Sequence, residues 1–300
     1  MLTGMQIAII GGDLRQIEVI RKLSKLDASI HLIGYEQLDN GFLGVEKSTF
    51  DTVRADKLDA LILPVNGISS KREIDSVFAG KQQFFKESWL AETPAHTRIY
   101  TGIANKALSE MASHAEKELI ELMNRDDLAI YNSIPTAEGA LMLVIQNTNV
   151  TVHKAKVVIT GFGRVGQTIA KTFSQLGADV SVAARETDLL ARAYTMGMEP
   201  VSLSELGNRA AQADVVINTI PAEVLTAEVI AKMPNHALIV DIASKPGGTN
   251  FEFAKKRGIH AILTPGLPGL VAPKTAGIQL ANLLSSLLEE QWQEQKGGKR

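Results

Sequence analysis

Short apolar runs recur along the first half of the chain and are separated by longer stretches of mixed polarity. The runs, which predict buried strands, lie at residues 6–10, 30–33, 60–63, 99–102 and 128–131. Between the first two runs, residues 14–26 carry apolar side chains every three or four positions, the spacing of an amphipathic helix. Strands that alternate with helices predict a parallel sheet with both faces covered.

The second half of the chain repeats this rhythm. Its apolar runs lie at residues 157–159, 180–182, 214–219, 237–243 and 261–263. Two such halves predict an α/β fold of two Rossmann-like, doubly wound parallel-sheet domains with a cleft between them. We expect ligands at the carboxyl ends of the strands, where open α/β sheets bind them.

The domain limits follow from changes in this pattern. Residues 1–150 form the predicted amino-terminal, substrate-binding domain, and residues 151–274 form the predicted dinucleotide-binding domain. A leucine-rich helix at residues 275–292 is expected to pack back onto the first domain, and residues 293–300 to form a disordered tail.

A second long helix is predicted from residue 132 to about residue 147, before a polar passage into the second domain. Pro135 suits a first helical turn, and either Ser133 or Thr136 can cap it. Glu138 then lies near the positive end of the helix dipole.

Three glycines between a strand and a helix carry the strongest chemical signal. Gly161 permits a tight turn, Gly163 lets the backbone approach a pyrophosphate, and Gly166 lets the helix pack against its strand. Such a pattern inside a βαβ unit predicts a dinucleotide site. The expected loop contacts also include Phe162, Arg164 and Val165.

The second strand of this unit ends at Arg185, where an NAD site usually carries an acidic residue. A guanidinium suits a 2′-phosphate, so the sequence favours NADP over NAD. Two alternatives stay open. Glu186 follows directly and places a carboxylate within reach of the ribose, and Arg185 is otherwise an ordinary solvated cation.

Three later loops leave strands at the same edge of the predicted sheet. The residues expected to line the cofactor there are Thr219, Ile220, Pro221, Asp241, Ala243, Gly266 and Leu267. The Pro- and Gly-rich segment 264–273 indicates a rigid loop. The alternative is that this segment only guides the chain into the last helix.

The first turn of the amino-terminal half, residues 11–16, breaks the dinucleotide pattern. Asp13 stands at the second glycine position, where its side chain and charge oppose a phosphate. We therefore interpret this half as a nucleotide-type fold without a nucleotide. Asp13, Arg15 and Gln16 follow the first strand and are candidate site residues, although Asp13 also suits a helix cap.

Composition narrows the possible partners. The chain has 300 residues, a formal charge of −2 and no cysteine, which excludes disulfides and thiolate chemistry. The small net charge gives no reason to expect nucleic acid or a membrane surface. The start predicts a strand and no signal peptide, so we expect a cytoplasmic protein. The six histidines show no metal-binding spacing, and we expect no metal.

Several motifs together resemble the A subunit of bacterial dipicolinate synthase across almost the whole chain. They are GGDLRQ at 11–16, YNSIPTAEGA at 131–140, GFGRVG at 161–166, NTIP at 218–221, DIASKPGG at 241–248 and TPGLPGLVAPKTAG at 264–277. The resemblance implies oxidation of a dihydrodipicolinate, derived from hydroxytetrahydrodipicolinate of the lysine pathway, to dipicolinate. It also implies a partner, the flavoprotein-like B subunit, and the mother cell of a sporulating bacterium as location. We further expect a homo-oligomer.

Positions at strand and helix ends suggest the substrate contacts. The predicted dicarboxylate ligands are Arg15, Asn66, Ser133, Thr136 and Lys274. A carboxylate, from Asp13 or Glu138, or a water molecule is expected to accept the ring proton. For Lys274 the alternative is a solvated surface lysine.

Two other functions remain possible from the sequence. One is an NADP-dependent 2-hydroxyacid or imino-acid dehydrogenase. Against it, the 264–277 loop holds no histidine where that family's acid–base residue is expected. The other is a cofactor-sensing, non-catalytic component of a heteromeric synthase.

Overall fold

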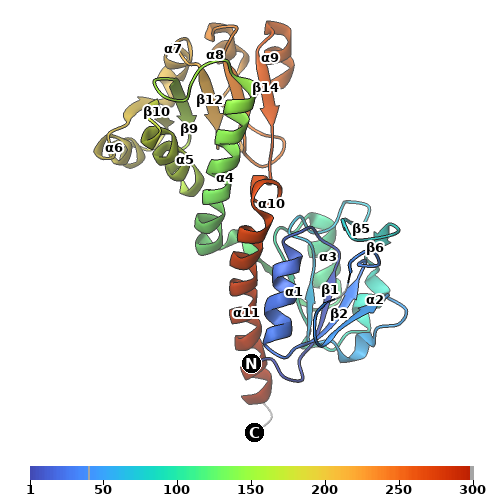
Figure 1. The fold of residues 1–300 in the computed structure, drawn as a ribbon. Helices are drawn as coiled ribbons and strands as arrows, with labels where there is room; N and C mark the ends of the chain where they lie inside the picture. The colour runs from blue at the N-terminus through green and yellow to red at the C-terminus, as the bar shows by residue number, and fades with distance from the viewer. Residues whose placement is uncertain (40, 298–300) are drawn as a thin grey trace. The chain divides into compact units, whose positions relative to one another are not determined.

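The computed structural model describes residues 1–39 and 41–297, which form two compact units (Figure 1). Unit 1 comprises Met1–Ala129 with Pro273–Arg300, and unit 2 comprises Ile130–Ala272. The division falls at residue 130, whereas the sequence pattern predicted it at residue 150. The reason is a helix whose later residues, such as Ala140 and Val144, belong to the core of unit 2.

Unit 1 is built on a six-stranded parallel sheet in the order β3-β2-β1-β4-β7-β8. The strands are β1 (Gln6–Ile10), β2 (Ser29–Ile33), β3 (Val45–Ser48), β4 (Ala60–Ile62), β7 (Arg98–Thr101) and β8 (Glu118–Glu121). The helices are α1 (Gln16–Lys25), α2 (Glu87–Ala91), α3 (Lys106–His114) and α11 (Pro273–Gly297). Short 3-10 turns lie at Ala55–Lys57 and Leu122–Asn124. A small antiparallel hairpin, β5 (Glu73–Ile74) with β6 (Gln83–Phe84), follows β4.

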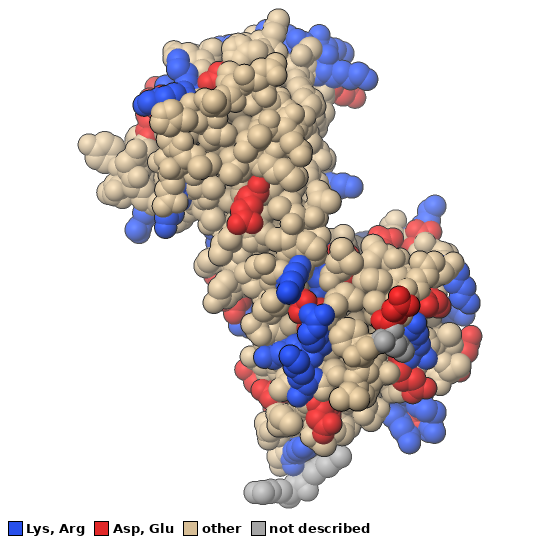
Figure 2. Space-filling view, in the orientation of Figure 1, with Lys and Arg blue, Asp and Glu red and all other residues tan. Residues whose placement is uncertain are grey.

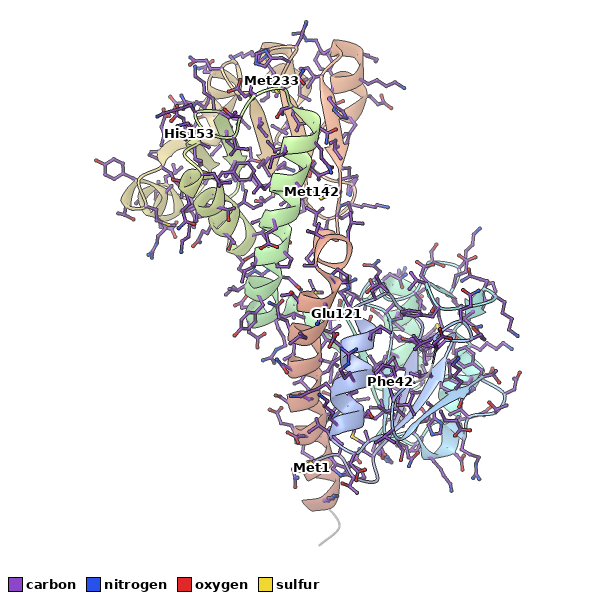
Figure 3. All side chains as sticks on the ribbon, in the orientation of Figure 1. Met1, Phe42, Glu121, Met142, His153 and Met233 are labelled. Carbon is purple, nitrogen blue, oxygen red and sulfur yellow. The ribbon has the colours of Figure 1, made fainter. Side chains whose placement is uncertain are left out.

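Unit 2 is built on a second six-stranded parallel sheet, in the order β11-β10-β9-β12-β13-β14. Its strands are β9 (Lys156–Thr160), β10 (Asp179–Ala184), β11 (Glu199–Ser202), β12 (Val215–Asn218), β13 (Leu238–Asp241) and β14 (His260–Leu263). Its helices are α5 (Arg164–Gln175), α6 (Thr187–Thr195), α7 (Leu206–Ala210), α8 (Ala227–Lys232), α9 (Phe251–Arg257) and α10 (Leu267–Val271), with a 3-10 turn at Leu203–Glu205. Figure 3 places Met233 close to the end of α8 and His153 beside α5.

Both sheets share one topology. Counted along the chain within each sheet, the strand order is third, second, first, fourth, fifth, sixth, as in dinucleotide-binding folds. The predicted α/β fold class is therefore confirmed. In each unit the order reverses between the first and fourth strands, which is where such sheets bind ligands.

One predicted strand is wrong. Residues 128–131 lie in α4 (Asp126–Asn147), and the sixth strand of the sheet is β8 instead. Leu128 and Ala129 are buried while Ile130 and Tyr131 are exposed, so a helix places this apolar run partly in the core and partly outside it. A short apolar run does not distinguish a strand from a helix segment.

The expected start of α4 is also wrong. The helix begins at Asp126, so Pro135 lies in its interior and the residues after it are not in a first turn. The Ser133 hydroxyl donates to the Ile130 carbonyl at 2.6 Å, and the Thr136 hydroxyl donates to the Asn132 carbonyl at 2.7 Å. Both therefore bond backwards along the helix instead of capping it. Glu138 is exposed and far from the amino-terminal dipole.

Helix α4 is long and apolar enough to span a membrane by composition alone, with a mean hydropathy of 1.4 over its most apolar window. Its apolar face has another explanation. Ala137, Ala140 and Val144 pack with Val157 and Ile159 of β9 in the core of unit 2. Figure 1 shows α4 beside the strands of this sheet. The buried side chains of the helix thus belong largely to the core of unit 2.

Helix α11 packs on α1, and the two lie side by side in Figure 1. Gly277 makes the close approach possible, because a Cβ there would lie 2.6 Å from the Arg15 carbonyl oxygen. Leu280, Leu284 and Leu288 enter the core of unit 1. Residues 293–297 of the expected tail continue this helix, and residues 298–300 lie outside the described part of the chain.

Charged side chains of both signs are mixed on the face of unit 1 that Figure 2 shows. The face of unit 2 in the same view carries wide areas without a charged side chain. Several lysine and arginine side chains gather on this face of unit 1, with acidic side chains around them.

The anchoring of α11 can be tested with Leu284→Ala. The Leu284 side chain is fully buried, so truncation leaves a cavity and is expected to lower the free energy of unfolding by about 2–5 kcal/mol. Urea denaturation followed by circular dichroism measures the change. Asn282→Ala on the exposed side of the same helix is the control and is expected to have little effect. Equal effects of the two variants would contradict this packing.

Candidate functional site

The glycine loop after β9 has the geometry that the sequence predicts. Gly161 adopts φ +88°, and a Cβ there would lie 2.4 Å from Thr219 Oγ1. At Gly166 a Cβ would lie 2.2 Å from the Gly161 carbonyl oxygen. At Gly163, in contrast, a Cβ would meet nothing within 4 Å. Two glycines thus allow close packing within the protein, and the third faces open space that suits a ligand.

Helix α5 begins directly behind this loop. Gly163 precedes the helix and, having no side chain, gives it no capping hydrogen bond. The amino-terminal N–H groups and the positive end of the dipole are therefore available to an anion. Phe162 is fully buried, so only its backbone is available to a ligand. The site fits the pyrophosphate of a dinucleotide.

Arg185 follows β10 at the same edge of the sheet. Its side chain is exposed, and within the described residues the guanidinium has no ion pair or hydrogen bond. Glu186 is exposed beside it and makes no capping bond to α6. The position predicted to recognise the adenosine ribose thus holds a cation without a partner among the described residues, followed by a carboxylate.

A buried polar network joins the next strand ends. The Asp241 carboxylate is fully buried and accepts hydrogen bonds from four donors: Asn218 Nδ2 at 2.9 Å, Ala243 N at 3.1 Å, Gly248 N at 2.8 Å and Thr249 Oγ1 at 2.6 Å. Thr160 Oγ1 donates to Asn218 Oδ1 at 2.5 Å. Asp241 therefore holds the loop after β13 in place, and its predicted cofactor contact stays a prediction.

The other expected cofactor contacts divide into two groups. Thr219 and Ile220 lie against the glycine loop, and Pro221 is exposed beside them. Leu267 is buried and packs against Gly139 of α4, where a Cβ would lie 3.1 Å from Leu267 Cβ. The side chain of Leu267 thus helps to pack α10 on α4.

Unit 1 carries a cavity of about 540 Å³ at its carboxyl edge. It lies at the reversal of strand order, since it is lined by residues that follow β1 and by residues that follow β4. The lining residues are Gly12, Asp13, Pro64, Val65, Asn66, Ile74, Asp75, Ser76, Val77, Ala79, Gly80, Lys81 and Gln82. Two predicted site residues, Asp13 and Asn66, thus line one pocket.

Asp13 is held by Arg15 in a two-pronged ion pair. Arg15 Nη2 lies 2.6 Å from Asp13 Oδ2, and Arg15 Nε lies 2.9 Å from Asp13 Oδ1. Burial raises the pKa of Asp13, but the hydrogen bonds and charge of Arg15 outweigh it and lower the pKa below 3.8. Arg15 is only 7% exposed. Its guanidinium is committed to Asp13, so it acts on this pocket through that carboxylate.

The sheet register shows why unit 1 differs from unit 2. Gly11 N donates to the Ile33 carbonyl just as Gly161 N donates to the Ala183 carbonyl, so Tyr35 stands where Arg185 stands. Tyr35 is buried and stacks on Phe78 with ring centroids 5.1 Å apart. Burial and the nearby Asp13 charge raise the pKa of Tyr35, so its hydroxyl stays protonated and donates to the Gly11 carbonyl. Aromatic rings fill the space that an adenosine ribose would need.

The remaining predicted substrate residues lie elsewhere. Gln16 is buried beneath Gly12 and donates to the Leu63 carbonyl at 3.4 Å. Lys274 is exposed near the start of α11. Ser133, Thr136 and Glu138 belong to α4 in unit 2, where the Ser133 hydroxyl also bonds Thr168 Oγ1 at 2.6 Å. Their part in substrate binding stays a prediction.

The segment 74–83 lines much of the cavity, and the sequence motifs did not point to it. Asp75, Ser76, Lys81 and Gln82 are the polar lining residues that the sequence motifs did not indicate. The available signal was length, because the connection from β4 to β7 leaves the carboxyl edge and contains only the short β5–β6 hairpin and the short helix α2. Long connections at this edge tend to carry function. Within residues 1–39 and 41–297 no acidic or histidine cluster suited to a metal is found.

Comparison with known families agrees with this architecture. Residues 103–299 match the family described as alanine dehydrogenase/PNT, C-terminal domain. Together with the open glycine loop, this match defines a dehydrogenase-type enzyme of the class that uses a nicotinamide cofactor. Residues 6–123 match a narrower family, described as the N-terminal domain of the dipicolinate synthase A subunit.

Individual relatives cover almost the whole chain. The A subunit of dipicolinate synthase from Bacillus subtilis is 49% identical over 97% of this chain and 98% of its own. The crystal structure of the Bacillus halodurans A subunit has a TM-score of 0.95 at 51% identity, covering 96% of this chain and 99% of its own. The crystal structure of the B. subtilis protein has a TM-score of 0.93 at 48% identity, covering 98% and 99%. The chain belongs to the family of dipicolinate synthase A subunits, and the resemblance predicted from its motifs is confirmed.

The glycine loop can be tested by a matched pair of substitutions. Gly163→Ala adds a methyl group in open space, so we expect normal thermal stability and at least about tenfold weaker dinucleotide binding. Gly166→Ala forces a Cβ against the Gly161 carbonyl and is expected to lower the melting temperature. Calorimetric titration and thermal unfolding measure the two effects. Unchanged dinucleotide binding by the stable Gly163→Ala variant would refute the assignment.

The Asp13–Arg15 pair gives a pH dependence with a definite sign. Because the folded-state pKa of Asp13 lies below its ordinary 3.8, the stabilisation is present above that pH and is lost as the pH falls through the lower value. The difference in unfolding free energy between wild type and Asp13→Asn is expected to stay constant above about pH 5 and to shrink below it. Urea titrations at several pH values measure it. A difference that grows on acidification would be incompatible with the pair.

Proposed function

We propose that the chain oxidises a dihydropyridine dicarboxylate, dihydrodipicolinate, to the aromatic pyridine-2,6-dicarboxylate with NADP as oxidant. One ring C–H bond breaks as hydride transfers to NADP, one proton leaves to a base, and the products are dipicolinate and NADPH. The observation that carries this proposal is the near-complete coverage by dipicolinate synthase relatives, combined with an open glycine loop.

The choice of NADP rests on Arg185. Its exposed guanidinium, unpaired among the described residues, lies at the end of β10, and a planar guanidinium can bond a phosphate at two points. The cofactor supplies the hydride acceptor, and the chain supplies orientation and charge compensation. Gly161, Gly163 and Gly166 form the backbone cradle for the pyrophosphate, and Thr219 and Ile220 line its side.

The substrate side of the proposal rests on the cavity in unit 1. Formation of an aromatic ring favours hydride loss, so the protein needs to orient the ring and offset two carboxylate charges. Asn66 offers an amide to a carboxylate, and Asp13, set in place by Arg15, offers a fixed polar wall. Lys274, Ser133, Thr136 and Glu138 are further candidates, from α11 and α4.

The low pKa of Asp13 affects which group can accept the proton released from the substrate ring. A carboxylate whose charged form is stabilised by a guanidinium is a weaker base than a free one. We therefore assign Asp13 to positioning, and the proton passes to another carboxylate or to water. The rival function, a 2-hydroxyacid dehydrogenase with a histidine base, finds no support at this cavity, because no histidine is among the described residues that line it.

The name of the relatives supports one part of the proposed setting, a partner subunit. Their name designates the A subunit of a synthase, which implies more than one part. We propose that the chain works with a B subunit, that it self-associates, and that it acts in the cytoplasm of the mother cell during sporulation. A chain that binds NADP but needs its partner for turnover is the second candidate, favoured by that name.

The decisive experiment follows NADPH formation at 340 nm, with the pure chain and with freshly generated cyclic precursor. Turnover by the chain alone supports the proposal. Turnover only after the second subunit is added supports the partner-dependent form. Absence of both turnover and NADP binding in the presence of the partner would overturn the assignment.

Cofactor preference can be tested with Arg185→Ala. Loss of a charge-assisted contact to the 2′-phosphate is expected to weaken NADPH binding by about tenfold to a hundredfold and to leave NADH binding unchanged. Fluorescence titration of the bound nicotinamide measures both affinities. Arg192→Ala, which removes an exposed arginine of α6, is the control and should bind like wild type. Equal weakening for NADPH and NADH would count against 2′-phosphate recognition.

A further inference from the structure

The segment 74–83 of unit 1 is fastened across the carboxyl end of β1. Gly12 N donates to the Asp75 carbonyl at 2.8 Å, and Val77 N donates to the Gly12 carbonyl at 3.0 Å. Gly12 adopts φ +117°, and a Cβ at Gly11 would lie 2.7 Å from the Asp75 carbonyl oxygen. The backbone of the segment therefore lies directly over the turn that would otherwise bind a pyrophosphate.

Side chains hold the same segment from the end of β2. Ser76 Oγ donates to the Gly34 carbonyl at 2.6 Å. The Glu36 carboxylate accepts from Gly80 N at 3.0 Å and from Gln83 Nε2 at 3.4 Å. Phe78 stacks on Tyr35. Attachments at both ends give residues 79–82, which line the cavity between them, a defined position.

Three of the six polar side chains that line the cavity already have a partner. Ser76 bonds Gly34, Gln82 Nε2 donates to the Ile74 carbonyl at 3.1 Å, and Asp13 is paired with Arg15. In the described part of the chain, the side chains of Asn66, Asp75 and Lys81 line the cavity without a hydrogen bond or ion pair of their own. These three side chains are therefore available to bind a ligand.

Lys81 is the one cationic side chain among the described residues that line this cavity. Arg15 does not line it, because its guanidinium is buried and bound to Asp13. The lining also carries two carboxylates, Asp13 and Asp75. A ligand with two negative charges therefore depends on Lys81 for direct charge compensation.

We propose that Lys81 binds one carboxylate of the cyclic dicarboxylate substrate, with the Asn66 amide as a second donor to the same group. The inference rests on the proposed function and specifies the substrate-recognition residue of its cavity. An ammonium group from the segment 74–83 and an amide N–H₂ from the residues after β4 complement the two oxygens of a carboxylate. Asp75 adds a negative charge to the same lining, and this charge disfavours ligands with more negative charge than Lys81 can offset.

The test measures binding of pyridine-2,6-dicarboxylate to the full chain by calorimetry in metal-free buffer, with and without NADP. Lys81→Gln is expected to weaken binding by about tenfold or more, because it removes a charge-assisted hydrogen bond. Asp75→Asn is expected to strengthen binding, since it removes a like charge. Lys71→Gln is the matched control, since Lys71 is exposed on the same connection but does not line the cavity.

A second ligand separates charge recognition from general damage. Pyridine-2,6-dicarboxamide, which has the same shape but no charge, should bind equally to wild type and Lys81→Gln. If wild type and Lys81→Gln bind the dicarboxylate with equal affinity, the role of Lys81 is overturned and the proposed function stays intact. Failure of the wild type to bind the dicarboxylate while it still binds NADP would instead overturn the proposed substrate, and the role of Lys81 with it.

Discussion

The buried carboxylate of Asp241 fixes the carboxyl edge of the sheet in unit 2, where the glycine loop lies. Removing the Asp241 charge from water is costly, and the cost is offset only because four donors converge on its two oxygens. Those donors come from the end of β12 and from the loop after β13. If either segment shifted, the buried charge of Asp241 would lose hydrogen bonds. Through Asn218 the same network reaches Thr160 at the end of β9, directly before the glycine loop.

Most of the strands that the sequence predicted well are buried on both faces. Each of β1, β9, β12 and β13 is an almost continuous apolar run, and such runs are typical of central parallel strands. The edge strands β3 and β8 carry Glu46 and Glu118 on their exposed sides, which weakens that signal. The run at 128–131 was misassigned because its burial depends on packing partners that are distant in sequence.

The residues of the candidate site also differ in how well the sequence predicted them. The glycine loop was predictable because Gly161 and Gly166 satisfy steric requirements set within a few residues, which single positions in the sequence reveal. The pairing of Asp13 with Arg15 was not predicted, although the residues are two positions apart, because each residue type is by itself equally suited to bind a ligand. Lys81 was missed because only the folded chain brings the segment 74–83 to the end of β1.

Two sheets of identical topology suggest two equivalent nucleotide sites, and Tyr35 argues against that interpretation. Its ring and that of Phe78 occupy in unit 1 the position that corresponds to the exposed side chain of Arg185 in unit 2. An adenine nucleotide could enter there only by displacing a stacked aromatic pair and a buried hydroxyl hydrogen bond. The proposed function accordingly expects one dinucleotide for each polypeptide, bound by unit 2, and assigns the smaller substrate to unit 1.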